Sequence, residues 1–526
     1  MTSSYTTNLP SDSVQPPPQT LISSASESTP LLQSSNIVYE DIPLGDAPDD
    51  MTYDLKEAAF IVRKSVPIVL TYLIEFSLQI VCVISLGHLG SVELASSALA
   101  SMYASVTGWS VTFGAATALD TLCSQAFTSG NPMLVGVYLQ RTIIIIFLIT
   151  IPIAAIWLEA ESILIFLGQR EDLARKAGLF LRCLLFGAPA FIMFECLKKY
   201  LQAQGIVKAP TYILVIAATL NIFLNYILVW YEPLSLGFIG APIATATTYW
   251  FMLILLVGYI RYFDGYQVWG GWTKQCLSGW GEVVMLAVPG IFMVCSEWWA
   301  FELVALAAGY FGETALAAQS VILTTSSTLF QFPFGVAISA SNRVGNLLGA
   351  GLVKRAQVSS RMSMALSVMV GGTTMSLLLM CRHSWGYLFT GDKEVVELVA
   401  SVLPMCAAFQ ISDALGTVGG GIVRGLGRQK VGATLNIIAY YLIGLPLSLV
   451  TAFLLDWQLI GLWAGLTVGS MCVGIGESIM IIKTNWRWEA ENVRIRFLAD
   501  TKVKRNNELN REVGNGLDDG VEHGSA

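Results

Sequence analysis

The chain has 526 residues, of which 54% are hydrophobic and only 13% are charged. Soluble proteins carry about a quarter charged residues. The charges of this chain are concentrated in its two ends and in short connections, and the formal net charge of −7 comes largely from the ends. Because a charge in hydrocarbon is costly, this pattern indicates an integral membrane protein. No basic patch with interleaved aromatic residues lies away from the expected membrane flanks, which argues against nucleic-acid binding.

The N-terminal segment differs in composition from the rest of the chain. Residues 1–55 are rich in Ser, Thr and Pro and contain no Lys or Arg, which predicts disorder. Apolar segments of about 20 residues then recur, the length that spans about 30 Å of hydrocarbon. Twelve such segments are expected, approximately at 66–87, 94–126, 134–158, 178–198, 211–230, 238–260, 283–309, 315–346, 362–381, 396–421, 434–454 and 459–482.

The basic residues indicate how these spans are oriented. With an even number of spans, most Lys and Arg residues lie on the side of the two tails. One Arg, Arg182, lies inside a span. The opposite side holds only Arg170, Arg175, Lys176, Arg382 and Lys393. The positive-inside rule therefore predicts that both ends of the chain are cytosolic.

The two halves of the sequence resemble each other at a spacing of about 221 residues. The matching pairs of segments are 87–90 with 309–312, 113–116 with 334–337, and 205–208 with 427–430. Six plus six helices in the same orientation form a parallel repeat, and such repeats enclose a central cavity and rock against each other. We therefore expect two pseudo-symmetric lobes.

The expected fold class is an all-α integral membrane protein with twelve transmembrane helices in two six-helix lobes. Its parts are a disordered cytosolic tail, an N-lobe with helices one to six, a C-lobe with helices seven to twelve, and a second cytosolic tail. Their bounds are 1–60, 61–265, 266–485 and 486–526.

Seven acidic residues lie in the interior of the expected spans. An unpaired carboxylate in lipid is expensive, so each is expected to face a cavity or a partner. Protonating a buried carboxyl group is often cheaper than burying its charge, and a carboxyl group that gains and loses a proton as its surroundings alternate can drive antiport. The seven are Glu75, Asp120, Glu195, Glu297, Glu302, Asp413 and Glu477.

The strongest candidates lie in the middle of the seventh and tenth spans. Glu297 and Glu302 are five residues apart, about 140° around a helix, so they do not share one face. Asp413 is the acid of the tenth span. Trp298 and Trp299 could stack on a flat cationic substrate, although packing or interfacial anchoring explains each indole equally simply.

The remaining acids are open to two interpretations. Glu75 and Glu195 can act as secondary acids or can only fix helix packing, and Glu477, near the end of the last span, favours the packing role. Asp120 lies near the cytosolic end of the long second span, where a gate or an interface is as compatible with its position as a coupling site.

Four motifs resemble the eukaryotic, fungal side of the multidrug and toxic compound extrusion (MATE) family. They comprise residues 87–95, 118–126, 297–299 and 424–433, and the resemblance covers roughly residues 60–485. It implies two six-helix lobes arranged as a V and antiport of organic compounds against protons. It also implies that Glu297 and Asp413 are the coupling acids, with Gln319 of the eighth helix as a polar neighbour.

Two departures from the family pattern matter. Bacterial relatives carry an aspartate in the first helix, where this chain has Cys82, which argues against N-lobe coupling through that position. The second-helix motif of relatives has Glu and Gly where this chain has Asp120 and Ser124. The first of these changes keeps the carboxyl group.

The expected function is export or sequestration of small organic, cationic xenobiotics or metabolites in exchange for protons. A lipid-linked substrate flippase of related architecture is the nearest alternative, although its phosphate-bearing substrate would favour a cationic cavity. Sodium coupling stays open because carboxylates bind either ion. A membrane enzyme is disfavoured because no span places a histidine at its centre, and no GxxxxGK[ST] loop is present for ATP.

No metal or organic cofactor is expected. The nine cysteines mostly lie in apolar runs and form no CxxC pair, which is typical of small buried side chains. The expected partners are small organic substrates and the lipid bilayer. An acidic dileucine pattern with Glu27, Leu31 and Leu32, and a second pattern at residues 39–42, resemble adaptor-read sorting signals. They favour a vacuolar membrane over the plasma membrane.

Overall fold

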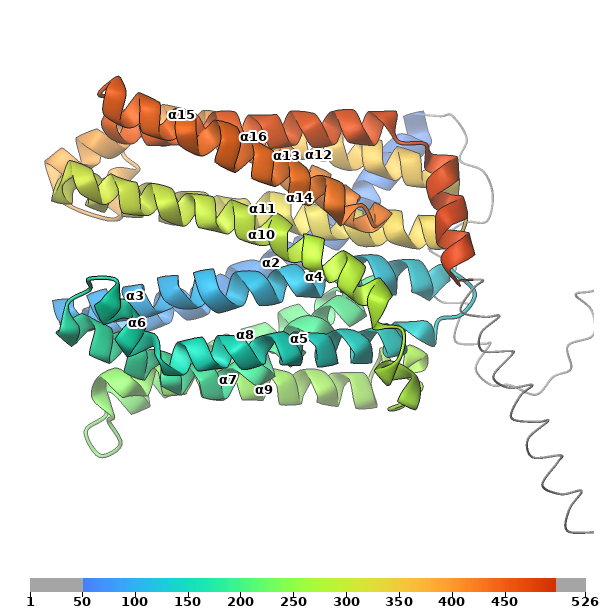
Figure 1. Cartoon of the computed structure of the whole chain (residues 1–526), viewed down its shortest axis with the longest axis horizontal. Helices are drawn as coiled ribbons and strands as arrows, with labels where there is room; N and C mark the ends of the chain where they lie inside the picture. The colour runs from blue at the N-terminus through green and yellow to red at the C-terminus, as the bar shows by residue number, and fades with distance from the viewer. Residues whose placement is uncertain (1–50, 498–526) are drawn as a thin grey trace, which may run out of the picture. The chain divides into compact units, whose positions relative to one another are not determined.

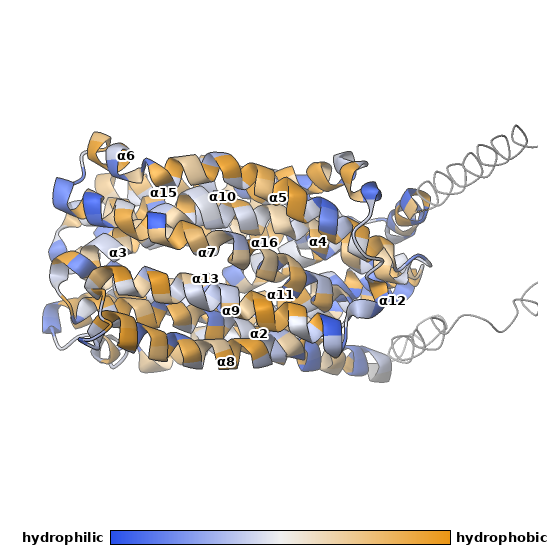
Figure 2. Cartoon of the chain, turned by 90° about the horizontal axis from the view of Figure 1, so that it is seen from below, coloured by the Kyte–Doolittle hydropathy of each residue, from blue (hydrophilic) through white to orange (hydrophobic). Residues whose placement is uncertain are grey.

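The computed structural model describes residues 51–497, and every regular element in that range is helical (Figure 1). The helices run roughly side by side. Their polar residues gather at the two ends, and their hydrophobic residues cover the middle (Figure 2). This banding is what a hydrocarbon layer imposes on a helical bundle.

The N-lobe contains the first six membrane spans. Short helix α6 (Ala160–Phe166) connects the third span to the fourth. The spans are α2 (Met51–Gly87), the continuous run of α3 (Ser91–Ala104), η1 (Ser105–Trp109) and α4 (Ser110–Thr128), α5 (Leu134–Leu158), α7 (Glu171–Ala203), α8 (Lys208–Asn225) with η2 (Tyr226–Trp230), and α9 (Gly240–Tyr262).

The C-lobe contains the other six spans. Residues 486–497 form a further helix after the last span. The spans are α10 (Trp280–Ala308), α11 (Glu313–Gly349), α12 (Val353–Cys381), α13 (Lys393–Leu426), the run of α14 (Gln429–Ile437), η8 (Ile438–Gly444), α15 (Leu445–Leu449) and η9 (Val450–Leu454), and α16 (Gln458–Lys483).

The expected fold class is confirmed, with one informative exception in hydropathy. Among the described residues, 11 helices are long and apolar enough to cross a membrane on those grounds alone. The remaining span is the second one in chain order, residues 91–128. It is less apolar because it is rich in Ala, Ser, Thr and Gly. Its π-helical segment η1 interrupts the regular α-helix after Ala104. It lies between the lobes, where helix contacts replace lipid.

Helical structure begins before the expected start of the N-lobe and continues past the last span. Residues 51–60 were expected in the disordered tail, but they form the first turns of α2. Residues 486–497 were expected in the C-terminal tail, but they are helical and bury Trp486, Val493 and Phe497. Apolar burial on one face holds this helix against the bundle, a signal that a composition-based tail boundary overlooks.

The internal repeat is visible in how equivalent helices end. Gly205 follows α7 and Gly427 follows α13, and both have left-handed backbones, with φ of 79° and 77°. The next amide donates in each case to a carbonyl five residues back, Ile206 to Leu201 and Arg428 to Val423, both at 3.0 Å. This Schellman-type ending needs a residue that tolerates positive φ, which explains why glycine recurs in both halves.

Several helix pairs join the lobes, and two of these pairs are related by the internal repeat. Helix α4 packs against α10, and α2 packs against α11; Figure 1 shows α4 running beside α10. A Cβ added at Gly114 of α4 would lie 2.5 Å from Ile291 Cα and 2.8 Å from the Gly290 carbonyl oxygen of α10. The repeat-equivalent Gly335 of α11 similarly meets Val69 of α2. Glycine at these two positions lets the helices of opposite lobes approach closely.

Candidate functional site

The C-lobe contains a buried cluster of acids from three helices. We call Glu297 of α10, Asp413 of α13 and Glu477 of α16 the C-lobe acid cluster. Asp413 is 4% exposed and Glu477 is 0% exposed, whereas Glu297 is partly exposed. The charges of Glu297 and Asp413 interact, and Arg424 is the cation that acts on both Glu297 and Glu477. One guanidinium therefore faces two of the three carboxyl groups, and it also lies 3.5 Å from Asp120.

This arrangement favours binding of a cation or a proton. An uncompensated buried carboxylate is costly, so the cluster is stabilised when one of its oxygens binds a proton or faces a positively charged ligand. Tyr440 of η8 adds a hydroxyl group that is 2% exposed and within the fields of all three acids. Tyr440 is not among the residues predicted from sequence, and the position of Glu477 near the end of its span favoured a packing role. Neither has a local sequence signal, because their helices meet only in the folded lobe.

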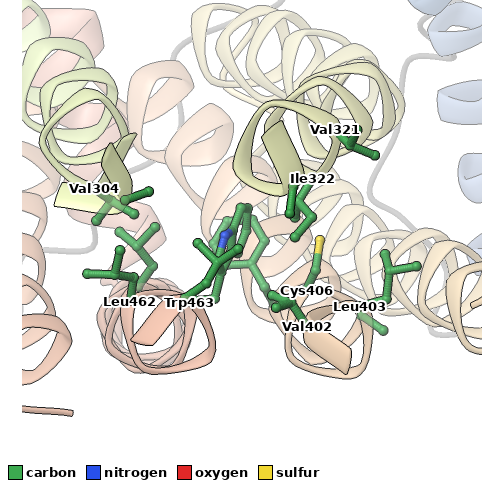
Figure 3. Close-up of a cluster of buried hydrophobic side chains, with 14 of the residues drawn as sticks. Val304, Val321, Ile322, Val402, Leu403, Cys406, Leu462 and Trp463 are labelled. Atoms are coloured by element: carbon green, nitrogen blue, oxygen red, sulfur yellow. The ribbon is translucent and has the colours of Figure 1, made fainter. Parts of the chain in front are cut away.

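Gln319 lies in the apolar core of the C-lobe, which also contains Tyr440. Its side chain is 1% exposed, and its Oε1 accepts a hydrogen bond from Trp463 Nε1 at 2.8 Å. Figure 3 shows Trp463 among the side chains of this core, close to Ile322 and Cys406. The contact satisfies the indole N–H that burial of Trp463 would otherwise leave without a partner.

The tryptophans after Glu297 contact the other lobe. Trp299 Nε1 donates to the Val106 carbonyl oxygen of η1 at 3.0 Å, and the ring of Trp298 lies 5.8 Å from that of Phe113 in α4. These contacts place both indoles at the junction of the lobes. Glu302 is partly buried on α10 and has no hydrogen bond or ion pair within residues 51–497.

The N-lobe contains a second charged group, made of Glu75, Glu195 and Lys198, which we call the N-lobe triad. Lys198 Nζ is 2.8 Å from Glu75 Oε2 and also forms an ion pair with Glu195 Oε1. The Lys198 side chain is 0% exposed. From sequence, Lys198 and Lys199 look like membrane-flanking charges. A carboxylate three residues before Lys198 on the same helix is the signal that could have indicated a buried pair.

Asp120 joins the two lobes. Its carboxylate accepts from Lys199 Nζ of α7 at 2.8 and 2.9 Å, and its Oδ2 lies 3.5 Å from Arg424 Nε of α13. All three side chains are nearly fully buried. Asp120 therefore occupies an interface, and Arg424 connects this interface to the C-lobe acid cluster.

Further hydrogen bonds close the same end of the bundle in a pseudo-symmetric way. Gln125 of α4 donates to the Gly425 carbonyl oxygen at 2.9 Å, and the equivalent Asn346 of α11 donates to the Ala203 carbonyl oxygen at 3.2 Å. Each amide thus reaches the end of the fourth helix of the opposite lobe. Arg343 of α11 adds a bidentate ion pair, at 2.7 and 2.9 Å, with Glu57 of α2.

These cross-lobe contacts show at which end of the bundle the two lobes are joined. They lie where α4, α7, α11 and α13 end and where α2 begins, so the lobes are joined at the end that holds residues 51 and 497. Arg496 of the last described helix also donates to Gln125 at 2.9 Å. At the opposite end, α3 packs against α2 and α7 of its own lobe.

Helical spans in two pseudo-symmetric lobes, with acids buried between and within them, define a multi-pass membrane transporter. The MatE family model matches residues 67–227 and 289–450, one segment in each lobe. The chain belongs to this family, and both the relatives and the matching solved structures are transporters.

The relatives agree with this assignment. The chain is 43% identical over 431 residues to an uncharacterized transporter of Schizosaccharomyces pombe, which covers 82% of this chain and 80% of the relative. It is 39% identical over 449 residues to multidrug and toxin extrusion protein 2 of Mus musculus, which covers 85% of this chain and 78% of the relative.

Solved structures show the same fold. The crystal structure of the eukaryotic MATE transporter AtDTX14 matches with a TM-score of 0.79 at 32% identity, over 84% of this chain and 98% of that chain. The Vibrio cholerae MATE transporter VcmN in its bent form matches with a TM-score of 0.71 at 18% identity, over 85% of this chain and 99% of that chain. The second similarity concerns the fold alone.

Proposed function

We propose that this protein exports or sequesters small organic cations in exchange for protons. The observation that carries the proposal is the C-lobe acid cluster, in which two acids are buried, Glu297 is partly exposed, and Arg424 is a cation acting on Glu297 and Glu477. A relative named as a multidrug and toxin extrusion protein supports the substrate class. The predominance of acids favours a cationic substrate over a phosphate-bearing one.

In the proposed cycle, Glu297 and Asp413 bind a proton and a cation alternately. When the carboxyl pair faces the acidic side, a proton neutralises it and the organic cation leaves. When it faces the other side, the proton dissociates and the carboxylates attract a new cation. Mutually exclusive occupancy of one site is sufficient to couple the two fluxes, because each ligand binds only after the other has left.

The Asp120 contacts provide the gate in this proposal. Lys199, Asp120 and Arg424 hold the lobes together at the end that carries the chain termini. We propose that this end is cytosolic and that the described state is closed on that side. Opening there requires Arg424 to leave Asp120, which also changes the charge next to Glu297.

Uptake by proteoliposomes tests the proposed function. With an acidic lumen and no sodium, the purified protein is expected to accumulate a fluorescent organic cation against its concentration gradient. One pH unit is worth about 1.4 kcal/mol per proton and supports about tenfold accumulation. Accumulation driven only by a sodium gradient would replace proton coupling with sodium coupling. Absence of cation transport under either gradient would favour the flippase alternative.

We further propose a vacuolar membrane location, with the N-terminal tail cytosolic and read by adaptor complexes. The supporting residues, Glu27, Leu31 and Leu32, lie outside the described residues. Replacing Leu31 and Leu32 with alanine in a fluorescently tagged full chain is expected to move the protein from the vacuolar to the plasma membrane. If imaging shows the same membrane for both proteins, this sorting proposal is wrong.

A further inference from the structure

The N-lobe triad contains one more negative charge than positive. Glu75 of α2 and Glu195 of α7 both pair with the ammonium group of Lys198. Glu195 and Lys198 are both 0% exposed, and the Glu75 side chain is 12% exposed. Two carboxylates thus share one ammonium in a site whose exposed member is Glu75.

One oxygen of this site lacks a donor. Glu195 Oε2 is buried and has no hydrogen-bond partner among residues 51–497, and Lys198 meets the other oxygen. An anionic oxygen in that position has lost its water without replacement, which costs more than a neutral group in the same place. A proton on the carboxyl pair removes the excess charge and leaves one neutral acid beside one ion pair.

The surroundings supply no second cation to balance the charge. Lys199, the other cation that acts on Glu195, donates to both oxygens of Asp120. The Lys198 ammonium lies 4.1 Å from the ring centre of Tyr72, a cation–π contact that adds no charge. The titratable and charged groups that face the triad are Tyr72 and Cys82 of α2, Asp120 of α4, Cys196 and Lys199 of α7, and Tyr249 of α9.

We propose that the N-lobe triad binds and releases one proton during transport, in addition to the protons carried by the C-lobe acid cluster. This inference rests on the proposed proton antiport. Glu75, the exposed member of the triad, takes up the proton, and Lys198 then pairs with Glu195 alone. Loss of the proton restores the bridge of Lys198 between both carboxylates. Only a proton moves, and no covalent bond between heavy atoms changes.

The extra proton changes the electrical balance of transport. If each cycle exports one more proton from the vesicle lumen for each cation that enters, the net positive charge that leaves the lumen per cycle rises by one. An imposed potential of 100 mV changes the equilibrium accumulation about 50-fold for each net charge, about 2.3 kcal/mol. The potential that assists proton exit is inside-positive, opposite in sign to the potential that draws a lipophilic cation passively into a vesicle.

The test compares the wild type with Glu195→Gln and Glu75→Gln in proteoliposomes that accumulate a monovalent fluorescent cation. Either variant leaves one carboxylate paired with Lys198, a neutral combination that is expected to fold. Glu93→Gln is the matched control, because Glu93 is an N-lobe acid that is also ion-paired, with Lys176 at 2.6 Å, but at the exposed end of α3. Potential is set with valinomycin and potassium.

In both variants we expect each cycle to exchange one proton fewer per substrate, and therefore to move one net charge fewer across the membrane. Accumulation at one pH unit and zero potential should fall about tenfold, and the response to 100 mV should shrink about 50-fold, with Glu93→Gln unchanged. Equal proton-to-substrate ratios in wild type and both variants would overturn the inference while leaving antiport intact. Failure of the wild type to respond to pH would instead remove the proposed function itself.

Discussion

Replacing Glu297 with glutamine is expected to abolish pH-driven accumulation of the organic cation. The wild type can sustain about tenfold accumulation per pH unit for each coupled proton, and the variant should reach only the external concentration. Glutamine keeps the size of the side chain and removes the charge that attracts the cation and the proton. Because Glu297 shares Arg424 with other acids, losing one negative charge should not prevent folding.

Glu302→Gln is the matched control for this prediction. Glu302 lies on the same helix, α10, five residues further on, but no contact brings it to Asp413 or Arg424 among the described residues. It should retain accumulation, whereas Asp413→Asn should lose it. Wild-type accumulation by Glu297→Gln, in protein that elutes as a single species from size-exclusion chromatography, would show that Glu297 is not a coupling acid.

Replacing Gly114 with leucine is expected to eliminate transport and lower the melting temperature. Overpacking a well-packed site costs about 1–3 kcal/mol when side chains can shift. At Gly114 the first atoms met are the backbone of Ile291 and Gly290, which cannot rotate away. The helices α4 and α10 must therefore separate at the point where the lobes cross. Thermal unfolding of the purified protein and vesicle uptake measure the two effects.

The chain offers a matched control and a symmetric counterpart for this variant. Gly372 of α12 has no heavy atom within 4 Å of its Cβ position, so Gly372→Leu should behave as the wild type in both measurements. Gly335→Leu should reproduce the defect of Gly114→Leu, because the repeat places it at the crossing of α11 with α2. Normal transport and stability of Gly114→Leu would mean that the close crossing is not required.

The sequence predicted which residues would be near the site more readily than it predicted their partners. Glu297 and Asp413 stand out because an acid in an apolar span is costly and therefore rare. Lys198 and Lys199 do not stand out, because a lysine near the end of a span has an ordinary explanation as a membrane-flanking charge. Their carboxylate partners Glu75 and Asp120 come from other helices, so no local spacing reveals the pairs.

The expected role of Asp120 shows the same division. Its position near the end of the second span allowed a gate, an interface or a coupling site. Contacts with Lys199 and Arg424 place it between the lobes. Gln319 accepts a hydrogen bond from Trp463 in the apolar core that also contains Tyr440, and its expected role beside the acids stays a prediction.

The sequence by itself determined the helical membrane class, the twelve spans and the repeat of two lobes. These features follow from hydrocarbon thickness, the cost of charge in lipid and the need to satisfy every backbone group within a helix. Only the folded structure shows which acids face a cation, which glycines allow the lobes to cross and at which end of the bundle the lobes are joined. Those properties depend on distances between side chains far apart in the chain, which hydropathy and periodicity do not encode.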